Sequence, residues 1–113
     1  MLPRKARLRR NRDFDSVYKR GKCYPGKDLI LHVLATDPEN QKFGFSISKK
    51  VSKRAVDRNR LKRQLSHVVR EELKYLQKGV DVIFVVRKNL LNLSFSDLKF
   101  VVKSLLEKAK LYT

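Results

Sequence analysis

The residues with the strongest chemical character are the cations of one short stretch, residues 49–63, which reads KKVSKRAVDRNRLKR. This stretch holds eight Lys and Arg residues and a single acid, Asp57. Its second part begins a helix that the spacing of leucine and valine predicts over residues 55–76. Because the N-terminus of a helix already carries a partial positive charge, cations there are mildly destabilising. We therefore expect this stretch to bind a polyanion.

The cations of the predicted helix point in several directions around its axis. At about 100° per residue, Arg58 and Lys62 share one face of the helix. Asn59 and Arg63 share a neighbouring face, and Arg60 points in a third direction. This distribution fits several phosphate strands of a folded RNA better than one groove of a duplex. Arginine forks bind phosphate through two hydrogen bonds, and the Asn59 amide can reach a phosphate, a 2′-hydroxyl or a base edge.

A solvated surface helix is the alternative interpretation of this charge. Helices of that kind alternate acidic and basic residues, whereas this one has no acid between Asp57 and Glu71. We therefore favour phosphate binding, which should weaken steeply with salt because neutralised phosphates release their counterions.

A second group of residues combines aromatic rings with positive charge. Phe14 and Tyr18 are four residues apart, so they share one face of a helix predicted over residues 11–20. Packing in the core is the simpler interpretation of this spacing. The alternative is a platform on which unpaired bases stack, each worth about 1–3 kcal/mol. The nearby cations that favour this alternative are Arg10, Arg12, Lys19, Arg20 and Lys22.

A strand predicted over residues 43–48 has small side chains on one face. Gly44, Ser46 and Ser48 alternate there with apolar residues. A face of small residues lets another backbone approach closely, whether that of a bound strand or that of a helix of the same chain. The sequence leaves both possibilities open.

The side chains that would form a catalytic centre are absent or scattered. The eleven acids form no cluster, and the adjacent Glu71 and Glu72 face different ways on a helix. His32 lies in an apolar run and is interpreted as structural, while His67 is expected to be solvated. Cys23 is the only cysteine, which excludes a disulfide and a zinc site. The four dispersed glycines form no phosphate loop, so we predict no active site in this polypeptide.

Composition restricts the partner further. The chain has 113 residues, a net charge of +17 and a pI near 10.4, while its 42% hydrophobic content is sufficient for one ordered domain. No apolar run approaches the roughly 20 residues that cross a bilayer, and the N-terminus has no signal-peptide pattern. The lone cysteine fits a reducing compartment. We expect a cytoplasmic RNA-binding domain over residues 1–113, with neither DNA nor a membrane as partner.

The elements that position these residues can be predicted from local patterns. Residues 1–10 form a basic arm, expected to be flexible, and Asn11 and Gly21 are expected to bound the first helix. Residues 29–35 and 43–48 are predicted strands, expected to form an antiparallel hairpin.

The second half of the chain follows the helix over residues 55–76. Residues 80–86 (VDVIFVV) predict a central strand buried on both faces. Ser94 and Asp97 resemble a capping box that opens a last amphipathic helix. The order α-β-β-α-β-α indicates an α+β fold, a two-layer α-β sandwich.

At this point the residues resemble a known family. The string FSISKKVSKRAVDRNRLKR closely resembles the signature of the bacterial ribonuclease P protein subunit. That family carries Arg-Asn-Arg followed by x-Lys-Arg on its long helix, here residues 58–63, together with a basic N-terminus and an aromatic first helix, here DFDSVYKRG. The resemblance covers nearly the whole chain.

The resemblance implies a specific fold and role. It implies a left-handed β-α-β crossover, against the usual right-handed rule. It also implies the small subunit of a ribonucleoprotein that removes the 5′ leader from precursor tRNA and broadens substrate range, while the RNA subunit performs the hydrolysis and holds most of the Mg²⁺. By this match, the residues that contact the catalytic RNA are Lys49, Lys50, Lys53, Arg54, Arg58, Asn59, Arg60, Lys62 and Arg63. Phe14 and Tyr18 match the leader-binding cleft, and we add their expected neighbours Arg10, Arg12, Ser46 and Ser48.

Two other function classes remain as alternatives. A ribosomal or other structural RNA-binding protein would have the same composition. A nuclease that acts without RNA is disfavoured because it needs clustered carboxylates or a pair of histidines.

Overall fold

The computed structural model describes residues 2–113, which fold around one four-stranded sheet. The helices and strands follow the predicted order, with one additional short strand, β1, after the first helix. The α-helices are α1 (Asn11–Arg20), α2 (Ala55–Glu72) and α3 (Phe95–Lys108). The strands are β1 (Lys22–Tyr24), β2 (Leu29–Ala35), β3 (Gln41–Ser46) and β4 (Val80–Val86). Three 3₁₀ turns are η1 (Arg4–Ala6), η2 (Leu73–Tyr75) and η3 (Lys88–Asn92).

The strand order in the sheet is β1-β2-β4-β3, so the predicted hairpin is wrong. β2 pairs antiparallel with β1 and β4, and β3 pairs parallel with β4. The physical reason lies in β4, which is apolar on both faces and therefore takes the central place between β2 and β3. Strands 29–35 and 80–86 occur as predicted, whereas the strand predicted over 43–48 begins and ends two residues earlier.

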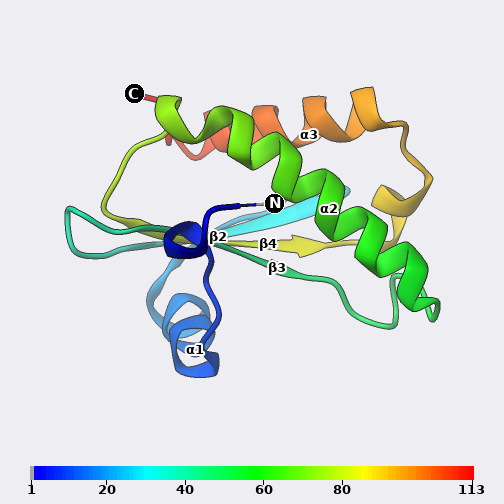
Figure 1. The fold of residues 1–113 in the computed structure, drawn as a ribbon, viewed down its shortest axis with the longest axis horizontal. Helices are drawn as coiled ribbons and strands as arrows, with labels where there is room; N and C mark the ends of the chain where they lie inside the picture. Colours follow the sequence, from blue (N-terminus) through cyan, green and yellow to red (C-terminus); the bar gives the residue numbers. More distant parts are fainter. Residues whose placement is uncertain (1) are drawn as a thin grey trace.

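The α+β sandwich is confirmed, and the sheet carries helices on both faces. Figure 1 shows α2 and α3 on one face and α1 on the other. Side chains along β4 alternate between the two faces of the sheet. Val82 and Phe84 join the main core, while Ile83 faces α1. The smaller core under α1 consists of Leu8, Val17 and Ile83, with Phe14, Leu34 and Val85 packed against it.

The N-terminal arm is not loose, contrary to the expectation for residues 1–10. Leu2, Ala6 and Leu8 are buried, and the backbone N–H of Leu8 donates a 2.9 Å hydrogen bond to the Phe43 carbonyl oxygen. These three apolar side chains lie between the cations and hold the arm against β3 and the core. The expectation for Met1 lies outside the described residues.

The long helix connects the two parallel strands. β3, α2 and β4 form a β-α-β unit, as parallel neighbours require a crossover. Its left-handed sense stays a prediction from the resemblance. The helix predicted to Leu76 is α-helical only to Glu72, and the chain then tightens into η2 before Gly79 turns it towards β4 with φ 81°.

The helix ends confirm two of the three predicted caps. The Ser94 hydroxyl accepts a 3.1 Å hydrogen bond from the Asp97 backbone N–H at the start of α3. Gly21 ends α1 as expected. Asn11, however, is the first helical residue, and Arg10 takes the capping position without a side-chain hydrogen bond. None of the helices in the described part of the chain is long and apolar enough to span a bilayer.

Candidate nucleic-acid interface

The loop that precedes α2 is held by serine hydroxyls and one apolar anchor. Ser48 Oγ accepts a 3.3 Å hydrogen bond from the Lys50 backbone N–H. Ser52 Oγ accepts one of 3.2 Å from the Arg54 backbone N–H, and donates one of 2.9 Å to Asp57 Oδ2. Buried Val51 fixes the loop to the core. The loop therefore presents four exposed cations in a defined order: Lys49, Lys50, Lys53 and Arg54.

The first two turns of α2 carry the remaining residues of the signature. Leu61 is buried and holds these turns against the core. Arg58 is half-buried, and its Nη1 donates a 2.8 Å hydrogen bond to the Ser52 carbonyl oxygen. Part of the Arg58 guanidinium therefore supports the loop. Four side chains are exposed or directed to the surface around it: Asn59, Arg60, Lys62 and Arg63.

The positive charge of this surface is almost unneutralised. Asp57 is its only acid, and the Arg54 Nε lies 4.0 Å from Asp57 Oδ2. Among residues 2–113, no other cation of the 49–63 stretch has an ion pair within 4 Å. Uncompensated cations that a helix start and a fixed loop hold together are suited to bind phosphates.

The aromatic pair of α1 lies on the opposite face of the sheet. The ring centroids of Phe14 and Tyr18 are 6.5 Å apart, and that of Tyr18 is 5.0 Å from that of His32 with the rings nearly perpendicular. Tyr18 is 41% exposed, while Phe14 is half-buried against the small core. Phe14 therefore packs as the core interpretation predicts, while Tyr18 presents an exposed ring, and its role in stacking on bases stays a prediction.

The small residues of β3 have different surroundings. A Cβ atom on Gly44 would lie 2.5 Å from Phe14 Cζ, so the glycine makes room for that ring. The close approach at Gly44 is therefore made by the chain's own helix. Ser46 follows on the same face and is half-buried. Ser48 lies beyond the end of β3 and belongs to the loop before α2.

A hollow of about 350 Å³ links the two predicted sites along β3. Its lining includes Phe14 and Gly44 from the α1 side, and Lys62 from α2. Arg7 and Arg9 of the arm also line it. Lys62 therefore lies close to the aromatic surface, although the sequence signature groups it with the cations that contact the catalytic RNA. Arg12 is exposed in the first turn of α1, whereas Arg10 lines a different, larger hollow.

Sequence reasoning missed Arg7, Arg9 and His32 as site residues. The two arginines were assigned to a flexible arm, and only the apolar spacing of Leu2, Ala6 and Leu8 could have indicated that the arm is fixed. His32 is interpreted as structural because it lies in an apolar run, and its contact with Tyr18 arises only when α1 packs on β2.

Comparison with known proteins decides the family. The profile of one family, described as Ribonuclease P, matches residues 2–110. The chain belongs to the ribonuclease P protein family. Its similarity to curated members extends over nearly the whole length. The ribonuclease P protein component of Rippkaea orientalis is 39% identical over 115 residues, which cover 97% of this chain and 91% of that protein. That of Microcystis aeruginosa is 41% identical over 114 residues, with coverage of 97% and 95%.

Solved ribonuclease P proteins share the fold. The protein from Thermotoga maritima superposes with a TM-score of 0.82 at 25% identity, covering 90% of this chain and 96% of that one. A Staphylococcus aureus structure superposes with a TM-score of 0.86 at 23% identity, covering 96% and 98%. The second likeness supports the fold alone.

The titratable side chains in the described part of this chain do not gather into a metal site. Within residues 2–113, no group of three or more His, Cys, Asp and Glu side chains could hold a metal ion. Burial lowers the pKa of His32 below its ordinary value, which favours the neutral ring beside Tyr18. The Nε2 atom of His67 lies 3.2 Å from Glu71 Oε1, and the His67 side chain is on the exposed side of α2.

Proposed function

We propose that this chain is the protein subunit of a ribonuclease P ribonucleoprotein that removes the 5′ leader of precursor tRNA. The observation that carries the proposal is the uncompensated cationic surface at the start of α2, in a chain that belongs to the ribonuclease P protein family. This surface binds the catalytic RNA subunit. The protein acts in the cytoplasm and broadens the range of substrates that the RNA subunit accepts.

Docking rests on the fixed loop and the first two turns of α2. Arg60, Arg63 and Lys62 neutralise phosphates of the folded RNA and release counterions. Arg58 contributes in two ways, since it holds the Ser52 carbonyl and keeps the rest of its guanidinium for RNA. Asn59 adds a hydrogen bond to a phosphate or a sugar. The loop cations Lys49, Lys50, Lys53 and Arg54 extend the same surface.

The leader is bound on the other side of the sheet. Tyr18 and the exposed edge of Phe14 stack on unpaired bases, which every base permits because each has a π-face. Arg10 and Arg12 neutralise phosphates of the single-stranded leader. Ser46 and Ser48 offer hydroxyls along β3 and its end.

The hydrolysis belongs to the RNA subunit in this proposal. That subunit would hold most of the Mg²⁺, which would supply stabilisation of the charge that develops on the phosphodiester oxygens. The side chains of this chain bind and orient the two RNAs, and we assign no step to a metal held by the protein.

Cleavage of precursor tRNA by the RNA subunit at low Mg²⁺, with and without the purified chain, tests the proposal. We expect the chain to accelerate cleavage strongly, because it supplies the positive charge that Mg²⁺ supplies at higher concentration. Unchanged cleavage would contradict the proposal and favour a structural RNA-binding protein. Cleavage by the chain without the RNA subunit would favour a protein nuclease instead.

A further inference from the structure

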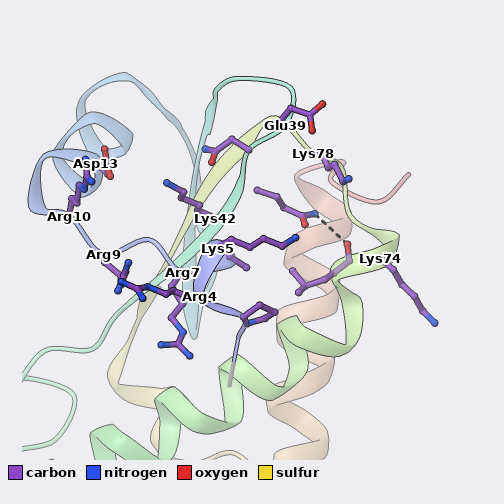
Figure 2. Close-up of a pocket in the computed structure, with 15 residues that line it drawn as sticks. Arg4, Lys5, Arg7, Arg9, Arg10, Asp13, Glu39, Lys42, Lys74 and Lys78 are labelled. Atoms are coloured by element: carbon purple, nitrogen blue, oxygen red, sulfur yellow. Dashed lines mark hydrogen bonds between the residues drawn. The ribbon is translucent and has the colours of Figure 1, made fainter.

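A hollow larger than the one along β3 lies beside the N-terminal arm, and of the site residues described above it includes Arg7, Arg9 and Arg10. It has a volume of about 1180 Å³ and opens where η1, the start of β3 and η2 meet. Figure 2 shows Lys5 and Lys42 extended across its middle, with Lys78 at one rim and Lys74 directed outward. Eight cations and two carboxylates line it: Arg4, Lys5, Arg7, Arg9, Arg10, Lys42, Lys74 and Lys78, with Asp13 and Glu39.

The structure itself gives these cations little to bind. Among residues 2–113, none of the eight has an ion pair within 4 Å. Arg7 Nε donates a 2.8 Å hydrogen bond to the Leu2 carbonyl oxygen, and the Lys74 ammonium lies 5.1 Å from the centre of the Tyr75 ring. Three separate segments bring these cations together, and the cations repel one another. A bound anion would offset this repulsion.

The basic hollow adjoins the smaller hollow beside the aromatic surface. The smaller hollow that contains Phe14 and Gly44 shares Arg7 and Arg9 with it. A single-stranded RNA whose bases stack on Phe14 can therefore continue past these two arginines into the basic hollow. The lining contains no aromatic side chain, so contacts there would be to phosphates and independent of sequence.

We propose that the basic hollow binds phosphates of the 5′ leader beyond the nucleotides that stack on Phe14 and Tyr18. This rests on the proposed function, since it concerns the same single strand. The continuity through Arg7 and Arg9 favours the leader over the backbone of the catalytic RNA as the occupant.

The test compares two precursor tRNAs with the assembled holoenzyme. One precursor carries a leader of about 4 nucleotides, enough for the aromatic surface, and the other a leader of about 12. The variant is Lys5→Gln with Lys78→Gln, two exposed residues that line the hollow from different elements. The matched control is Lys27→Gln with Lys108→Gln, which removes the same charge outside the hollow.

The variant should bind the long-leader precursor roughly five- to tenfold more weakly, and the salt slope of this binding should fall by about 1.4, for two lost phosphate contacts. Its affinity for the short-leader precursor and for the RNA subunit should equal that of the control. Equal loss for both leaders, a loss confined to the RNA subunit, or no loss would each overturn the inference. The parallel variant Phe14→Ala tests the proposed function separately, because it should weaken binding of both leaders.

Discussion

At the scale of single residues, Phe14 connects the core to the surface. Its ring packs on the small core under α1 and occupies the space that Gly44 leaves open. The same ring lies 6.5 Å from that of Tyr18, which is exposed. Core packing and base stacking are therefore compatible at this position, since a ring held firmly on one side can present its other edge at little entropic cost.

Gly44→Ala should disturb this arrangement. The new Cβ would lie 2.5 Å from Phe14 Cζ and 3.2 Å from Leu8 Cβ. Overpacking of this kind lowers the free energy of unfolding by about 1–3 kcal/mol, measurable by urea denaturation, and the displaced ring should also weaken leader binding. Ser46→Ala, on the same face, is the control and should change stability little.

A double-mutant cycle assigns the cause of this effect. In a Phe14→Leu background the steric conflict is reduced, so Gly44→Ala should cost less there than in the natural chain. Equal costs in both backgrounds would show that the ring does not explain the glycine.

The lowered pKa of His32 predicts that the free energy of unfolding depends on pH. Burial lowers its pKa below the ordinary 6.5, so the unfolded chain binds the proton more readily than the folded one. The contribution of His32 is therefore fully present above pH 6.5 and is lost as the pH falls towards the lowered value. His32→Phe keeps a ring beside Tyr18 and should flatten the dependence of the free energy of unfolding on pH in this window. Identical pH profiles for the two proteins would exclude this role.

At the scale of elements, the start of each helix decides what the helix presents. α2 begins after a loop held by Ser48, Ser52 and Val51, which fixes the direction of the docking cations. α3 begins at Ser94, whose hydroxyl accepts from the Asp97 backbone N–H. We expect the first loop to serve RNA binding and the second cap to serve stability.

Ser94→Ala should therefore lower the free energy of unfolding by about 1 kcal/mol, because it leaves an N–H of the first turn without its partner. Ser94→Asp, which can accept the same bond, should retain most of the stability. Ser96→Ala, in the same turn, is the matched control. Chemical denaturation measures all three, and a loss as large for Ser96→Ala as for Ser94→Ala would argue against the cap.

The predictions that succeeded depend on local patterns. The central strand Val80–Val86, the start of α2 and the Ser94 cap all follow from residues a few positions apart. The pairing of β3 with β4 does not, because it joins segments that are separated by the whole of α2. The short strand β1 has too few residues to show alternation, and it forms because β2 offers it an open edge.

The candidate site residues also divide into those that local sequence patterns reveal and those that only tertiary packing brings together. The cations at the start of α2 are visible in the sequence because four of them lie within six positions, 58–63, and their surface can be placed once the helix is known. The hollow that joins Phe14 to Lys62, and the approach of His32 to Tyr18, arise only from tertiary packing.

At the scale of the whole molecule, the net charge of +17 opposes the compact state. Anions that bind the folded chain should stabilise it in proportion to their binding. Sodium sulfate should therefore raise the melting temperature more than sodium chloride does at the same ionic strength, because chloride only screens. Equal shifts with the two salts would show that screening alone is responsible.

The two proposed RNA surfaces lie on different faces of the sheet, with α1 on one side and α2 on the other (Figure 1). Arg60 is exposed and forms no ion pair with any of residues 2–113, so its removal should change binding without changing stability. Phe14 is proposed to act on the leader side. We therefore expect the two surfaces to bind different RNAs.

The affinities of the Phe14→Ala and Arg60→Ala variants for three RNAs test this separation. Each variant is titrated against the RNA subunit, and each assembled holoenzyme against precursor tRNA and leaderless tRNA. Phe14→Ala should lose the preference for the leader, by about 1–3 kcal/mol, and keep its affinity for the RNA subunit. Arg60→Ala should bind the RNA subunit more weakly, with a salt slope smaller by about 1, and keep the leader preference once assembled. If both variants lost both properties alike, the two surfaces would not be separate and the account would be wrong.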